Sequence, residues 1–67
     1  MAWLCVTRWG DELICDCPPE KNDWCGDWEC FTSIEGEMID FKIELPKGSI
    51  EKLIGRALTW EDKPIEI

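Results

Sequence analysis

Apolar and polar residues alternate in several short stretches of the chain, and the first two predict a β-hairpin. Residues 2 to 8, AWLCVTR, are rich in residue types that favour strands. Gly10 and Asp11 supply a turn, and residues 12 to 17, ELICDC, are typical of a returning strand. Because side chains alternate across a strand, one face would carry Trp3, Cys5, Thr7 and Trp9 and the other Leu4 and Val6.

The middle of the chain predicts two more strands. Consecutive prolines end the returning strand, since neither can donate to a β-ladder, and residues 18 to 23 would form an exposed loop. Residues 27 to 33, DWECFTS, predict a third strand, followed by a turn over residues 34 to 37 around Gly36. Residues 38 to 45, MIDFKIEL, alternate most cleanly and predict a fourth strand. Its apolar face would hold Ile39, Phe41, Ile43 and Leu45.

The carboxyl-terminal third predicts one short helix. Ser49 is a suitable N-cap, and Gly55 can end the helix in a left-handed conformation. A helix this short persists only if its apolar residues, Ile50, Leu53 and Ile54, pack on a sheet. Residues 56 to 60 predict a short strand, residues 59 to 62 a turn, and residues 63 to 67 an edge strand.

Together these elements predict an α+β fold. It would be one small domain over residues 1–67, with a small, mostly antiparallel sheet, an N-terminal hairpin and one short helix near residues 49–54. A chain of 67 residues is marginal on core burial alone, although five tryptophans add apolar area. Burial against a second copy would also stabilise it, so the apolar pair Ile65 and Ile67 on the edge strand favours a homodimer.

Composition favours a cytoplasmic protein. Arg8, Asp11 and Glu12 interrupt the amino-terminal apolar residues too early for a signal peptide, and no run is long enough to span a bilayer. A reducing compartment argues against disulfides, as does an odd number of cysteines.

Charge is unevenly distributed. The net charge is −8, and residues 11 to 40 hold ten acidic residues and a single basic one. Such a segment repels nucleic acid and anionic membranes, so we expect neither as a partner. It favours contact with a basic surface of a host protein.

The cysteines allow three interpretations. Free thiols buried as small apolar residues are the preferred one, so no cofactor is required. Zinc is the main alternative, with Cys15, Cys17, Cys25 and Cys30 as ligands. Cys25 and Cys30 have ligand-like spacing, whereas Cys15 and Cys17 on a regular strand would lie about 6.6 Å apart. A disulfide is the third interpretation.

Catalysis is not expected. The chain has no histidine, the commonest general base, and no C-x-x-C pair for redox exchange. We therefore expect a non-enzymatic, acidic interaction module. Tryptophans are enriched at interface centres, and two of them lie in the acidic segment. The predicted partner-binding residues are Asp23, Trp24, Asp27, Trp28 and Glu29.

The stretch IELPKGSIEKLIGRALTWEDKPIEI, residues 43 to 67, resembles small uncharacterised proteins of gut Bacteroidales and their phages. The amino-terminal WLCVTRWGDELI is similar in kind. The resemblance implies an intracellular bacterial or phage accessory protein. Together with the small size and the segregated charge, it suggests a phage or mobile-element protein that binds and inhibits a host defence protein through a basic surface. It carries over no functional residues.

Overall fold

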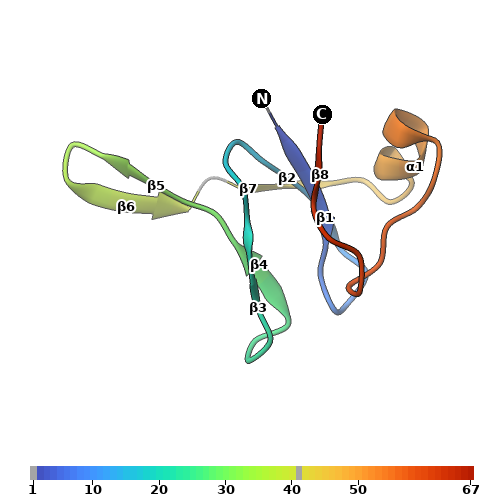
Figure 1. Cartoon of the computed structure of the whole chain (residues 1–67), viewed down its shortest axis with the longest axis horizontal. Helices are drawn as coiled ribbons and strands as arrows, with labels where there is room; N and C mark the ends of the chain where they lie inside the picture. The colour runs from blue at the N-terminus through green and yellow to red at the C-terminus, as the bar shows by residue number, and fades with distance from the viewer. Residues whose placement is uncertain (1, 41) are drawn as a thin grey trace.

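The computed structural model describes residues 2–40 and 42–67, and it is a small, mostly antiparallel β protein with one short helix (Figure 1). The predicted α+β fold is confirmed. The elements, in chain order, are β1 (Trp3–Val6), β2 (Glu12–Cys15), β3 (Glu20–Asn22), β4 (Asp27–Glu29), β5 (Phe31–Ile34), β6 (Glu37–Asp40), β7 (Lys42–Leu45), α1 (Ser49–Ile54) and β8 (Ile65–Glu66). No helix in the described part of the chain is long and apolar enough to cross a membrane.

The central sheet has four antiparallel strands in the order β7-β2-β1-β8. The N-terminal hairpin of β1 and β2 is confirmed, with Cys5 opposite Leu13 and Leu4 opposite Ile14. Both strands are shorter than predicted, and Trp9 lies on the exposed turn rather than on a strand face.

Each face of this sheet carries its own core. We call the first the sulfur core: it consists of buried Cys5, Leu13, Cys15, Trp28 and Cys30, with Trp3, Cys17 and Trp60 packed against it. We call the second the aliphatic core: it consists of buried Leu4, Val6, Ile50 and Leu58, with Ile14, Leu45, Ile54 and Ile65 packed against it. Because side chains alternate along a strand, successive residues of β1 and β2 point alternately into the sulfur core and the aliphatic core.

Helix α1 forms where the sequence predicts it, but its cap differs. Ser49 is not the N-cap; that position is Gly48, and the Ser49 hydroxyl donates to the Pro46 carbonyl. The Glu12 carboxylate from β2 instead accepts the backbone N–H groups of Gly48 and Ile50, at 2.6 and 2.7 Å. Gly55 ends the helix at φ 82°, as predicted.

Helix α1 also packs less completely than predicted. Ile50 is buried and Ile54 half-buried in the aliphatic core, but Leu53 points to solvent. The predicted strand over residues 56 to 60 is wrong, because that segment is irregular and leads into the predicted Thr59–Asp62 turn. The final strand is present as β8, which pairs with β1.

Residues 20 to 22 were expected to be loop, yet they form β3, which pairs with β4 in a two-stranded sheet. The predicted strand over residues 27 to 33 is interrupted at Cys30 and becomes β4 and β5. β5 pairs with β6 around the predicted turn, with Glu35 and Gly36 at φ 52° and 82°. Figure 1 shows the β5–β6 hairpin projecting away from the central sheet.

The predicted strand over residues 38 to 45 is likewise two strands, β6 and β7, which belong to different sheets. Its expected apolar face does not form as one surface: Leu45 packs on the aliphatic core, whereas Ile43 is exposed. Phe41 and the Ile39 side chain lie outside the described residues.

Candidate functional site

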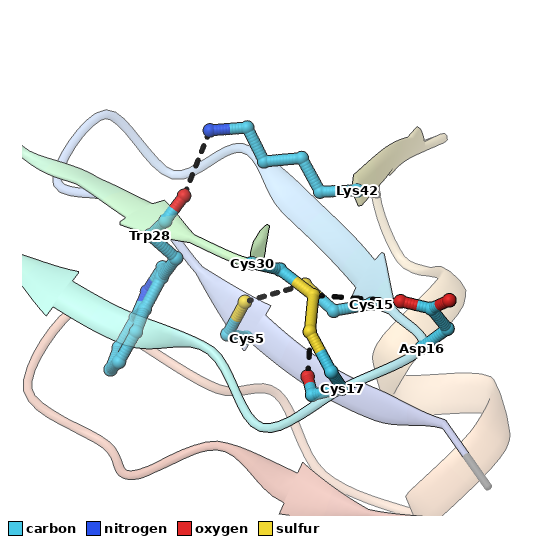
Figure 2. The surroundings of a disulfide bond; sticks show 7 residues. All are labelled: Cys5, Cys15, Asp16, Cys17, Trp28, Cys30 and Lys42. Carbon is cyan, nitrogen blue, oxygen red and sulfur yellow. Dashed lines mark hydrogen bonds between the residues drawn. A yellow bond between two sulfur atoms is a disulfide. The ribbon is translucent and has the colours of Figure 1, made fainter. Parts of the chain in front are cut away.

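Four of the five cysteines meet on one face of the central sheet. Cys5 comes from β1 and Cys15 from β2, while Cys17 follows β2 and Cys30 follows β4. Figure 2 shows their side chains converging, and all four belong to the sulfur core. Cys17 and Cys30 form a disulfide, which differs from our expectation of free thiols.

Cys5 and Cys15 keep their thiols, and their sulfur atoms lie 4.0 Å apart. Cys5 is opposite Leu13 and Cys15 is opposite Trp3, so the two cysteines are diagonal neighbours across the β1–β2 pair. The hydrogen bond with Cys15, together with burial, raises the pKa of the Cys5 thiol above its ordinary value of 9.0. Cys5 is therefore a neutral thiol at physiological pH.

Two oxygen atoms lie beside the Cys17–Cys30 disulfide. Asp16 Oδ1 lies 3.6 Å from Cys30 Sγ, and the Cys17 carbonyl oxygen lies 3.5 Å from the same sulfur (Figure 2). The ligand atoms of Asp16, Cys17 and Cys30 all lie within 4.8 Å of one another, close enough for a metal ion to contact them together.

The predicted zinc set is only partly brought together. Cys15, Cys17 and Cys30 converge, but Cys25 is exposed on the turn between β3 and β4. Cys5 is the cysteine that our sequence prediction missed. Its signal was present, because a hairpin register that pairs residues 3 to 6 with 12 to 15 places Cys5 and Cys15 on one face.

The second candidate region is the β3–β4 turn, residues 23 to 26. Trp24 is 95 % exposed there, whereas Trp28 is 4 % exposed and packs in the sulfur core. The Trp28 ring makes an edge contact with Trp60, with ring centroids 5.6 Å apart. Of the two predicted anchors, only Trp24 therefore offers its side chain to a partner.

The three predicted carboxylates also separate. Asp23 is exposed beside Trp24. Asp27 pairs with the Lys42 ammonium at 2.7 Å, and Glu29 accepts a hydrogen bond from Asn22 at 2.7 Å. Glu29 thus bridges β4 to β3, Asp27 joins the hairpin to β7, and Asp23 is the member of this set that remains at the turn.

The turn is fixed from two sides. Asn22 Oδ1 accepts the backbone N–H groups of Trp24 and Cys25, at 3.0 and 3.4 Å. Arg8, on the β1–β2 turn, donates its guanidinium to the Asp23 carbonyl and its backbone N–H to the Gly26 carbonyl. The β3–β4 turn is consequently joined to the β1–β2 turn.

Two cationic side chains, from Arg8 and Lys21, lie over the ring of Trp60. The Lys21 ammonium lies 4.3 Å and the Arg8 guanidinium 5.5 Å from the centroid of the Trp60 ring. Cation–π contacts of this kind contribute about 0.5–1 kcal/mol at exposed sites. They connect the hairpin and the β1–β2 turn to the carboxyl-terminal segment through Lys21, the basic residue of the acidic segment, and Arg8.

Comparisons with known proteins give no relative: no family model, no curated protein and no solved structure matches the chain.

Proposed function

We propose that this chain is a non-enzymatic interaction module that uses the β3–β4 turn, centred on Trp24, to bind a basic surface of a partner protein. One observation carries the proposal: Trp24 is 95 % exposed on a turn that is tightly hydrogen-bonded. A tryptophan ring can bury roughly 150–250 Å² on contact. Tryptophan is also among the residues most enriched at the centres of protein interfaces.

The order of the turn supports this use. Binding by a mobile loop loses conformational entropy, about 1–2 kcal/mol for each residue whose backbone becomes fixed. Asn22 Oδ1 accepts the backbone N–H groups of Trp24 and Cys25, and Arg8 donates to the Asp23 carbonyl, so the backbone on both sides of Trp24 is already fixed. Much of that entropic cost is therefore met within the folded chain.

A second exposed tryptophan extends the proposed surface. Trp9 is 69 % exposed on the β1–β2 turn, which the bond from Arg8 N–H to the Gly26 carbonyl joins to the β3–β4 turn. Figure 1 shows both turns at the end of the molecule opposite the two chain termini. We include Trp9 and Asp23 with Trp24 in the proposed contact surface.

Charge supports a basic partner. The chain carries a net charge of −8, and the exposed carboxylate of Asp23 lies on the β3–β4 turn, with exposed Glu20 at the other end of β3. Complementary charge mainly accelerates association and selects among partners. The narrower form, an accessory protein of a phage or mobile element that occupies a basic groove of a host defence protein, rests on this charge and on the resemblance of residues 43 to 67. Self-association through β8 stays a separate prediction, although Ile65 packs into the aliphatic core.

The test is a comparative capture from bacterial lysate with quantitative mass spectrometry. The full chain is immobilised as wild type, Trp24→Ala, Asp23→Asn and Leu53→Ala. Leu53 is the matched control because it is an exposed apolar residue on α1, distant in sequence from both turns. We expect wild type and Leu53→Ala to enrich the same basic protein, Trp24→Ala to lose it, and Asp23→Asn to recover less of it.

Salt provides a second criterion. Exposed charges are screened over about 8 Å at physiological ionic strength, so capture should weaken as salt rises. Equal enrichment by wild type and folded Trp24→Ala would remove the proposed anchor. Enrichment of an acidic protein, or capture that strengthens with salt, would contradict the charge assignment.

A further inference from the structure

The cysteines of the sulfur core can do more than pack, and this inference is independent of the proposed function. We propose that, when the Cys17–Cys30 bond is reduced, the sulfur atoms of Cys5, Cys15, Cys17 and Cys30 bind one zinc ion as a four-thiolate site. This set differs from the one that spacing predicted, because Cys5 replaces the exposed Cys25.

Two of the four sulfur atoms already lie at the spacing that a zinc ion requires. A tetrahedral zinc ion with Zn–S bonds of about 2.3 Å holds its sulfur ligands about 3.8 Å apart. Cys5 Sγ and Cys15 Sγ already lie 4.0 Å apart, so this half of the site needs almost no movement. Cys17 and Cys30, once reduced, must separate to that same spacing and also move toward the other pair, because the ligand atoms that already lie within 4.8 Å of one another are those of Asp16, Cys17 and Cys30.

Cys15 and Cys17 are separated by a single residue. On a regular strand Cys15 and Cys17 would be held about 6.6 Å apart, too far to share a metal. The structure removes this objection because β2 ends at Cys15 and the chain bends at Asp16 and Cys17. The bend turns Cys17 toward Cys30, with which it is bonded (Figure 2).

The ligand atoms in this cluster are mostly sulfur. Four sulfur ligands in a tetrahedral arrangement favour zinc over harder ions such as calcium or magnesium. Asp16 is the competing ligand, since its Oδ1 lies 3.6 Å from Cys30 Sγ. Asp16 is exposed, however, whereas Cys5, Cys15 and Cys30 are buried on the sheet face, so the thiolates form the enclosed set expected of a structural site.

The chemistry balances in two steps. Two molecules of a thiol reductant break the Cys17–Cys30 bond; each protein sulfur gains a proton, and the reductant molecules join in a disulfide. A zinc ion then binds the four sulfurs and releases four thiol protons to solvent, which leaves a centre of charge −2. Disulfide and metal are thus alternative states of one cluster, and only the reduced chain has enough ligands.

The experiment titrates cobalt(II), a spectroscopic stand-in for zinc, into the full reduced chain and then displaces it with zinc. We expect one ion per chain and a thiolate-to-cobalt charge-transfer band that zinc removes. Cys25→Ser and Asp16→Asn should bind like wild type. Cys5→Ser and Cys15→Ser should lose affinity by more than about 100-fold, because even changes outside the ligand shell cost about 10- to 100-fold.

Folding of these variants is checked first in the oxidised state, where the Cys17–Cys30 disulfide remains. A measurement on wild type avoids substitution altogether: alkylation followed by mass spectrometry, with and without zinc. Zinc should protect the four core cysteines and leave Cys25 reactive. The oxidised chain should bind no zinc.

Other outcomes overturn the proposal. Reduced wild type that binds no cobalt or zinc has no such site. Loss of binding in Cys25→Ser with retention in Cys5→Ser would restore the set predicted from spacing. Loss in Asp16→Asn with retention in Cys5→Ser and Cys15→Ser would reduce the site to Asp16, Cys17 and Cys30.

Discussion

Trp28 donates its indole N–H to the backbone carbonyl of Val6 at 2.7 Å, and this bond ties the β3–β4 hairpin to the central sheet. The Trp28 ring is buried in the sulfur core, and its own carbonyl accepts the Lys42 ammonium at 2.8 Å. The residue therefore anchors the hairpin through its ring, its N–H and its carbonyl.

The first prediction contrasts Trp28 with Trp24. Trp28→Ala should lower the free energy of unfolding by about 3–5 kcal/mol, the usual cost of removing a buried tryptophan. Trp28→Phe should cost less, although the lost indole donor alone is worth about 0.5–1.5 kcal/mol. Trp24→Ala should change stability by no more than about 0.5 kcal/mol, as exposed sites do. Urea denaturation of the three variants measures this, and a large loss in Trp24→Ala would show that the ring is not at the surface.

A second prediction concerns the cap of α1. Glu12→Ala should destabilise the protein by about 1–2 kcal/mol, because two backbone N–H groups at the helix start lose their acceptor. Glu12→Gln should fall between wild type and Glu12→Ala, since an amide keeps one acceptor oxygen. Glu44→Ala, an exposed acidic residue on β7, is the control and should be nearly neutral. Equal losses for Glu12→Ala and Glu44→Ala in urea denaturation would rule out the cap.

A third prediction isolates the contact between the two turns. Gly26 has a φ of 71°, and a Cβ there would lie 3.0 Å from Arg8 Cβ. Gly10 has a φ of 87°, but a Cβ at that position would meet nothing within 4 Å. Alanine at either site costs about 1–2 kcal/mol for the left-handed backbone. Gly26→Ala should cost roughly 1 kcal/mol more, measured by denaturation, because Arg8 must also move. Equal costs at the two glycines would mean that the turns are not tightly packed.

The fourth prediction concerns alkaline pH in the oxidised, metal-free protein. The pKa of Cys5 is raised in the folded state, so the unfolded thiol loses its proton first as pH passes its ordinary value of 9.0. The contribution of Cys5 to stability is complete below that value and is lost as pH rises toward the folded-state pKa. The loss should approach about 1.4 kcal/mol per pH unit.

This dependence is measured by urea denaturation from about pH 8 to about pH 10, across the ordinary thiol range. Cys5→Ala should show a shallower decline than wild type, and Cys25→Ala, which removes an exposed thiol, should retain the wild-type decline. Identical slopes for wild type and Cys5→Ala would exclude a buried neutral thiol at this position.

The local sequence pattern predicted the elements whose formation depends mainly on neighbouring residues. Alternation and a Gly-Asp turn predicted the β1–β2 hairpin, and helical spacing followed by Gly55 predicted α1. β3 was not predictable in this way, because Glu-Lys-Asn has little intrinsic preference for a strand. It forms because β4 pairs with it, and β4 is itself held to the central sheet by Trp28.

In the candidate site, too, some features follow from local sequence and others depend on the fold. Trp24 and Trp28 are the same residue type in the same acidic segment, yet one is exposed and the other buried. Only the docking of β4 on the sheet distinguishes them. The helix cap was equally hidden, because Glu12 lies far from Gly48 in the sequence and reaches it through the fold. Cys5 could have been placed, since it needed only the hairpin register.

The central sheet separates two cores of unlike chemistry, and this division has a consequence for how the protein opens. Apart from the exposed Cys25, the cysteine sulfurs lie in the layer that carries Cys5, Cys15, Cys17 and Cys30, so reagents that enter the core and react with sulfur act there and leave the aliphatic layer chemically untouched. Damage on one side should therefore release the β3–β4 hairpin while α1 stays docked on the other. In amide exchange, the β3–β4 hairpin and helix α1 would therefore open as two separate units on either side of the central sheet.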